Sequence, residues 1–264
     1  MAAAPIHRIA FFGGKPLSAR CLQLLHGMHA HDQLEIVAVC CRAEGERGWW
    51  SGPGVPEVRE TARALGLPVI DTPEQLATIP VDLGLSVLYH QVLPGSIVGH
   101  PRCGFLNLHL APLPHYRGCN ICSHAIMNGE TRFGVTLHRM DDKPDHGDVI
   151  AVRWFDIPPS ATARDLMDLS EAEGYRLFCE MLPSILSNAL PARAQQEIIE
   201  RDGVVSRYYR RDSLSTNGAK RVDLAWPADR IFNHVRALDF PPFEPAYAEI
   251  SGRRIYLTTR ARGG

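Results

Sequence analysis

Asn107 and His109 are the residues whose types and spacing point most directly to chemistry. They stand two apart in the apolar run 104–109 (GFLNLH), which predicts a strand with both side chains on one face. Prolines follow at once, so the pair lies at a strand end, where open α/β sheets bind ligands. An amide beside an imidazole can polarise a carbonyl group and move a proton. A purely structural polar pair is the alternative that the spacing leaves open.

An acidic segment follows at 141–148, with four carboxylates in eight residues. Their mutual repulsion favours an exposed loop, and Pro144 and Gly147 favour the same. A carboxylate of this loop that reached His109 would hold the imidazole in one tautomer, as the acid does in a catalytic triad. A plain surface turn and a weak cation site remain as alternatives.

Strands alternate with helices in the first part of the chain. Short apolar runs predict buried strands at 8–14, 34–41, 67–70 and 83–88. We expect one helix to begin near Ser18, as an N-cap, and a long one at Thr162, which forms a capping-box pattern with Asp165. This order predicts an α/β fold with a Rossmann-like, open and mostly parallel sheet.

The pattern becomes shorter and more mixed after Pro191. We therefore expect a catalytic domain over 1–195 and a small C-terminal α+β appendage over 196–264. The appendage is expected to serve substrate contacts or dimerisation. From 201 onward, twelve Lys/Arg stand against seven Asp/Glu, which fits either a phosphate-bearing ligand or a solvated face.

Composition and charge exclude several classes of protein. The 264 residues are 45% hydrophobic and 22% charged, as in a globular protein, and the net charge of −1 argues against a surface built for nucleic acid. No apolar run approaches the length that crosses a bilayer, and Met1 to Arg8 contains no signal-peptide stretch. Together with seven cysteines, an odd number, this predicts a cytoplasmic protein with reduced thiols.

Two further motifs are explained by local structure without a bound metal or nucleotide. Cys119 and Cys122 form a single CxxC, and a zinc site would need two more ligands, so we expect no metal. The Gly13-Gly14-Lys15 segment lacks the spacing of a phosphate-binding loop and of a dinucleotide fingerprint, so it predicts a tight turn.

Longer motifs carry a resemblance to a known family. The stretch 107–118 (NLHLAPLPHYRG) resembles the signature of the N10-formyltetrahydrofolate-dependent formyltransferases. So do Asn128-Gly-Glu, the run 133–138 (FGVTLH) and the run 145–150 (DHGDVI). The resemblance implies that Asn107, His109 and Asp145 are the family's catalytic trio and that N10-formyltetrahydrofolate brings the reactive carbon, without a metal.

Formyl transfer gives each member of the trio a role. A neutral amine attacks the formyl carbon, and Asn107 can donate to the oxyanion that develops. His109 can take the leaving proton or help to polarise the formyl group, because imidazole exchanges protons near neutral pH. Asp145 can orient His109 and stabilise it when charged.

The resemblance also implies two segments around the folate. One is the strand end and loop formed by Leu88, Tyr89, Gln91, Val92 and Leu93. The other is the loop Asp141, Asp142, Lys143 and Pro144, which would close the opposite side. Ordinary core packing is the alternative for the leucines.

The acceptor amine is expected to belong to a nucleotide-linked amino sugar. Arg-Gly-Cys-Asn at 117–120 and the tail segments around 207–211 and 240–247 resemble the sugar-nucleotide N-formyltransferases more than the methionyl-tRNA enzymes, which usually carry a larger basic C-terminal domain. The expected substrate contacts are Tyr116, Arg117, Gly118, Tyr208, Tyr209, Arg210 and Phe243. We expect a homodimer without nucleic-acid or membrane partners. A non-sugar amine (an amino acid, a peptide precursor or methionyl-tRNA) and a formyltetrahydrofolate hydrolase remain alternatives, and so does a catalytically idle binding protein.

Overall fold

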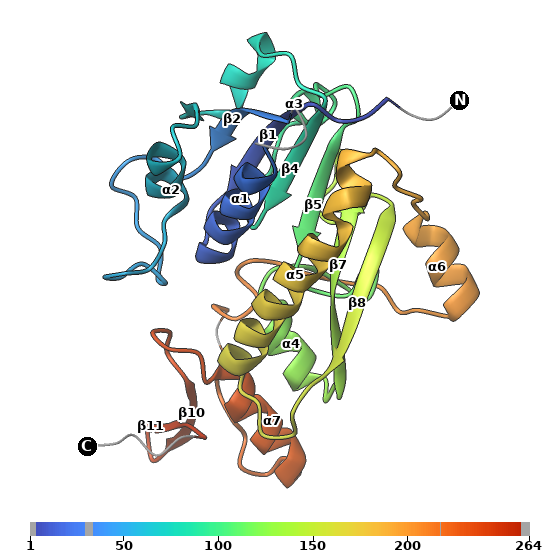
Figure 1. Cartoon of the computed structure of the whole chain (residues 1–264). Helices are drawn as coiled ribbons and strands as arrows, with labels where there is room; N and C mark the ends of the chain where they lie inside the picture. Colours follow the sequence, from blue (N-terminus) through green and yellow to red (C-terminus); the bar gives the residue numbers. More distant parts are fainter. Residues whose placement is uncertain (1–3, 30–33, 217, 260–264) are drawn as a thin grey trace.

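A seven-stranded sheet forms the centre of the computed structural model, which describes residues 4–29, 34–216 and 218–259 (Figure 1). The strand order is β3-β2-β1-β4-β5-β7-β8. The strands are β1 (Arg8–Gly13), β2 (Glu35–Cys40), β3 (Val69–Ile70), β4 (Leu83–Val87), β5 (Phe105–His109), β7 (Arg132–Arg139) and β8 (Val149–Asp156). Neighbours from β3 to β5 pair in parallel, and β7 and β8 pair antiparallel. The expected Rossmann-like, mostly parallel sheet is therefore confirmed.

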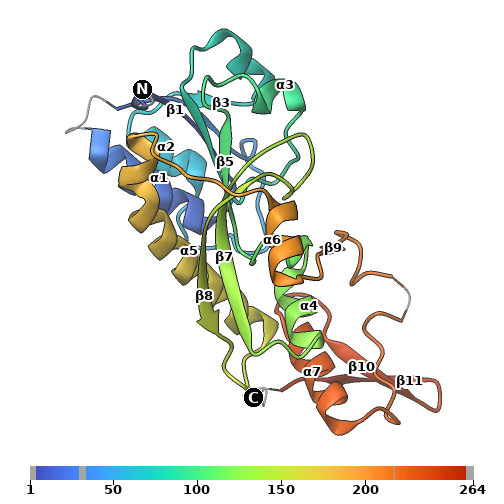
Figure 2. The same cartoon turned by 90° about the vertical axis from the view of Figure 1, so that its right-hand side faces the viewer.

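Some helices lie beside the sheet, and others belong to the C-terminal part of the chain (Figures 1 and 2). They are α1 (Pro16–His29), α2 (Val58–Ala64), the 3₁₀ helix η1 (Pro73–Thr78), α3 (Gly95–Val98), α4 (Ile121–Met127), α5 (Ala163–Leu186), α6 (Gln195–Asp202) and α7 (Ala228–Leu238). The capping box predicted for the long helix is present, with the Thr162 side chain accepting from the backbone N–H of Asp165.

The predicted N-cap at Ser18 is wrong, because α1 already begins at Pro16. The Ser18 hydroxyl still serves the start of this helix. It accepts from the backbone N–H groups of Gly14 and Lys15 and donates to the carbonyl of Val87. A serine inside the first turn thus ties α1 to β4.

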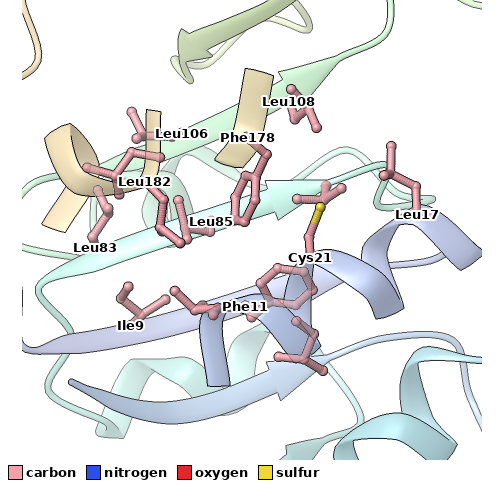
Figure 3. Packing of buried hydrophobic residues seen from close by; sticks show 14 of the residues in the cluster. Ile9, Phe11, Leu17, Cys21, Leu83, Leu85, Leu106, Leu108, Phe178 and Leu182 are labelled. Carbon is pink, nitrogen blue, oxygen red and sulfur yellow. The ribbon is translucent and has the colours of Figure 1, made fainter. Parts of the chain in front are cut away.

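The main core lies between the sheet and the helices α1 and α5. Figure 3 shows Phe11, Leu85 and Leu108 from three strands meeting Cys21 of α1 and Phe178 of α5. Because strand side chains alternate, residues 105, 107 and 109 of β5 turn to the opposite face of the sheet. Phe105 packs there in a second core cluster with Phe12.

Two small sheets belong to the C-terminal part. The parallel pair β6 (Tyr116–Gly118) and β9 (Arg207–Tyr209) brings the tail against the loop that follows β5. The hairpin β10 (Ala246–Ile250) and β11 (Arg253–Leu257) lies with α7 at the end of the molecule far from α3 (Figures 1 and 2). The division at 195/196 stays a prediction, and α6 begins at that point of the chain.

Candidate active site

Strand β5 places Asn107 and His109 together, as the sequence predicts. Leu106 and Leu108 are buried on the face under α5, so the two polar side chains share the other face. His109 is 8% exposed and Asn107 is half-buried. The strand therefore presents an amide and an imidazole at its carboxyl end.

His138 is a member of the site to which the sequence analysis gave no role. It lies opposite Asn107 in the antiparallel β5–β7 pair, and the Asn107 Nδ2 to His138 Nε2 distance is 3.1 Å. The Nδ1–H of His138 donates to the carbonyl of Arg139 over 2.6 Å, which leaves Nε2 as an acceptor for the amide. Burial lowers the pKa of His138 to about 4, so the ring is neutral at neutral pH. The sequence does contain a pattern that points to His138, because Thr136 and His138 stand two apart in an apolar run, as Asn107 and His109 do.

Asp145 joins the site from the acidic loop. Its Oδ1 lies 3.5 Å from Nδ1 of His109, and its Oδ2 accepts from the backbone N–H of Gly118 over 2.9 Å. The residue has a left-handed φ of 55°, and any side chain at Gly147 would collide with the carbonyl oxygen of Arg139. The tight turn at Asp145 to Gly147 thus places the Asp145 carboxylate next to the His109 imidazole.

The second nitrogen of His109 faces another acceptor. Its Nε2 lies 3.1 Å from the carbonyl oxygen of Tyr116. A neutral imidazole has one N–H and can satisfy one of the two acceptors, whereas an imidazolium can donate to both. Each ring nitrogen of His109 therefore faces an oxygen atom of the protein.

Thr136 holds the loop that carries these contacts. Its hydroxyl donates to the carbonyl of Ala111 and accepts from the backbone N–H of Leu113, at 2.7 Å and 3.0 Å. The start of the loop after β5 is therefore held by a side chain of β7.

The two segments expected around a folate lie near each other. A Cβ built at Gly95, just after the first segment, would stand 4.0 Å from the Cβ of Asp142. Within the first segment, Leu93 is buried in the core and the Tyr89 hydroxyl lies 3.4 Å from the Cys40 sulfur, whereas Val92 is 71% exposed. The segment therefore combines core anchors with an open edge.

The second segment is held by its own contacts. Asp141 accepts from the backbone N–H of Lys143 over 2.9 Å and lies 2.7 Å from Nδ1 of His146. These hydrogen bonds lower the pKa of Asp141 in spite of its partial burial, so it remains ionised. Asp142, Lys143 and Pro144 are exposed along the rim. Backbone groups and exposed side chains are thus available there for a polar ring.

The expected substrate contacts fall into two groups. Tyr116, Arg117, Gly118 and Tyr209 are engaged within the protein: Tyr116 donates to Glu130, Arg117 to Gln195 and Gly118 to Asp145, and Tyr209 stacks on His124. Tyr208 and Phe243 are 60% and 52% exposed, and the exposed Arg210 pairs with Asp212. The second group is exposed to solvent, whereas the first is bonded within the protein.

A cavity of about 740 Å³ opens beyond the carboxyl ends of β1 and β2. It is lined by Gly13 and Gly14, by the loop from Cys41 to Arg47 and by the segment from Gly52 to Arg63. The backbone of His90, after β4, lies close to Gly14. The cavity therefore lies beside the predicted folate segment that contains His90. Both are near the point between β1 and β4 where the strand order reverses, a usual place for ligands in α/β sheets.

Aromatic rings gather near this cavity. The Lys15 ammonium lies 5.6 Å and 5.4 Å from the ring centres of Trp49 and Trp50, and Trp49 also contacts Phe240 and Phe243. Burial lowers the pKa of Lys15. The loop that lines the cavity is thereby packed against the tail that carries Phe243.

Among the residues that the structure describes, no group of three or more His, Cys, Asp or Glu side chains is arranged to hold a metal ion. Cys122 is buried, and burial raises the pKa of its thiol to about 12. The CxxC thus offers no reactive thiolate at Cys122.

Comparison with known proteins agrees with this geometry. The model of the formyl transferase family matches residues 8–182. The chain belongs to the formyl transferase family. The methionyl-tRNA formyltransferase of Bradyrhizobium diazoefficiens is 32% identical over 257 residues, covering 93% of this chain and 77% of that protein. That of Acidobacterium capsulatum is 32% identical over 211 residues, covering 76% of this chain and 64% of that protein.

Solved structures share the fold. WlaRD, a sugar 3N-formyl transferase solved with dTDP and 5-N-formyl-THF, has a TM-score of 0.74 at 22% identity, over 95% of this chain and 85% of its own. The N-formyltransferase of Helicobacter canadensis, solved with folinic acid and dTDP-3-aminofucose, has a TM-score of 0.75 at 22% identity, over 98% and 90%. The expected formyltransferase family, its fold and its enzymatic formyl transfer are confirmed. No helix in the described part of the chain is long and apolar enough to span a membrane.

Proposed function

We propose that this formyltransferase moves the formyl group of N10-formyltetrahydrofolate onto the amine of a nucleotide-linked amino sugar. The observation that carries the catalytic part is the meeting of Asn107, His109 and Asp145 at the carboxyl end of β5, with the carboxylate 3.5 Å from the imidazole. An amide donor, a proton acceptor and a stabilising carboxylate are what acyl transfer to an amine requires.

The donor supplies a formyl carbon, and the side chains handle charge and protons. One N–H of the Asn107 amide is held by His138, and the other donates to the formyl oxygen as negative charge develops on it. His109 keeps Nε2–H on the Tyr116 carbonyl and takes the amine proton at Nδ1, beside Asp145. The same proton then passes to the folate N10 as its bond to the formyl carbon breaks. Asp145 stabilises the imidazolium between these two transfers.

The folate is proposed to lie between the segments 88–93 and 141–144. Tyr89 and Leu93 pack in the second core cluster and Leu88 against the main core, and together they anchor one side. Gln91 and Val92 form the open edge of that side, and Asp141 to Pro144 close the other side. The facing positions of Gly95 and Asp142 support this arrangement.

The sugar-nucleotide acceptor is supported by several observations. Arg-Gly-Cys-Asn at 117–120 resembles the sugar-nucleotide enzymes more than the methionyl-tRNA enzymes, and the two solved relatives named above were solved with dTDP or a dTDP-amino sugar. On this chain, Tyr208, Arg210 and Phe243 are exposed and could stack on a base or meet a diphosphate. We propose these three as acceptor contacts and retain the homodimer as an expectation to be measured by light scattering.

Methionyl-tRNA is the second candidate acceptor, because the curated relatives that are 32% identical act on it by name. Incubation with N10-formyltetrahydrofolate and a panel of dTDP-amino sugars, methionyl-tRNA and free amino acids separates the candidates. Mass spectrometry reads the gain of one formyl group on each acceptor. We expect formylation of a nucleotide sugar. Formylation of methionyl-tRNA alone would make methionyl-tRNA the acceptor, and formate release without any amine would make the protein a hydrolase.

A further inference from the structure

Gln195, the first residue of α6, is buried directly behind the loop that carries Asp145. The residue as a whole is 4% exposed. The Nε2 amide donates to the carbonyl of Asp145 over 3.0 Å and to the carbonyl of Gly147 over 2.8 Å. Both N–H groups of the amide are therefore spent on the tight return of this loop.

The oxygen of the same side chain holds Arg117. Both Nε and Nη2 of Arg117 donate to Oε1 of Gln195, over 3.0 Å and 2.7 Å. Arg117 precedes Gly118, whose backbone N–H donates to the Asp145 carboxylate. One buried amide thus fixes the backbone of Asp145 on one side and the strand that binds its carboxylate on the other.

We infer that Gln195 is a positioning residue that sets the angle of the Asp145 carboxylate toward His109. The inference rests on the proposed catalytic role of Asp145. That residue is held in a left-handed conformation and stands 3.5 Å from the imidazole, so a small relaxation of the loop changes the contact. Arg117 then acts on Asp145 through Gln195 and through strand β6, which carries Gly118.

The experiment compares Gln195→Met with Gln196→Met by steady-state kinetics. Methionine keeps the volume and removes the donors and the acceptor. Gln196 is exposed, and its amide donates to Glu200 on the same helix. For Gln195→Met we expect kcat to fall roughly tenfold or more with little change in KM for the formyl donor, because alignment and not binding is lost. Gln196→Met keeps the wild-type rate.

A double-variant cycle asks whether the effect passes through Asp145. In the Asp145→Asn background, Gln195→Met should cause little further loss, because the carboxylate that it positions is gone. An equal fold loss in both backgrounds, or a normal kcat for Gln195→Met, overturns the inference. A normal rate for Asp145→Asn alone contradicts the proposed function instead, so the two failures are distinguishable.

Gln195→Glu serves if the methionine variant does not fold. Glutamate keeps an acceptor for Arg117 but cannot donate to the two carbonyls. We expect the same fall in kcat with donor binding retained, and a wild-type kcat in this folded variant also overturns the inference.

Discussion

His138 lies opposite Asn107 across the β5–β7 pair and accepts a hydrogen bond from its amide over 3.1 Å. Because His138 also donates to the Arg139 carbonyl, the amide of Asn107 can present only one orientation to it. The side chain expected to meet the formyl oxygen is therefore set by a residue that need not touch the substrate.

Replacing His138 should slow catalysis. In His138→Leu the amide loses its acceptor and can rotate, so we expect kcat to fall roughly tenfold or more with a smaller change in KM. The matched control is His100→Leu. His100 is part-buried, but it donates to the carbonyl of Ile79, outside the site formed by Asn107 and His138. Equal kinetics for the two variants would show that His138 does not orient the amide.

Acid should destabilise the protein between about pH 6.5 and pH 4. Burial lowers the pKa values of His138 and His124 from 6.5 to about 4 in the folded state. Between these pH values the two histidines bind protons in the unfolded chain but remain neutral in the folded chain. The free energy of unfolding therefore falls as pH falls. Urea unfolding measured from pH 4 to 7 should show a shallower pH dependence for the His124→Asn and His138→Asn double variant. An unchanged slope would remove these two histidines as the cause.

Gly118 should tolerate no side chain. It has a φ of 92°, and an added Cβ would collide with the backbone carbonyl oxygen of Tyr209 in the neighbouring strand β9. Gly54 has a comparable φ of 74° but no atom within 4 Å of an added Cβ. Gly118→Ala should therefore lower the free energy of unfolding by about 1–3 kcal/mol more than Gly54→Ala, because only the former adds a steric clash to the conformational cost. Equal urea midpoints with equal m-values would contradict the β6–β9 contact.

The sequence was sufficient to predict the chemistry carried by local patterns. Period-two alternation placed Asn107 and His109 on one face, and proline and glycine marked the Asp145 loop, because strands and turns are governed by near neighbours. The resemblance to formyltransferases then identified which of the four acids belongs to the site.

Contacts between distant segments could not be predicted in the same way. His138 reaches Asn107 only through the antiparallel register of β5 and β7, and Gln195 lies 50 residues beyond the loop that it holds. The predicted boundary at 195/196 falls directly after Gln195, whose amide donates to the carbonyls of Asp145 and Gly147 in the acidic loop. Pairing across such separations depends on tertiary packing, which no local period encodes.

The rate of formyl transfer by Asp145→Asn in a single turnover tests the central claim most directly. Asparagine keeps the shape of the side chain but cannot stabilise the imidazolium of His109. With donor and acceptor both saturating, we predict a rate at least about a hundredfold below that of the wild type, with donor binding unchanged. A rate within about threefold of the wild type would contradict the assignment of Asn107, His109 and Asp145 as the group that transfers the formyl carbon.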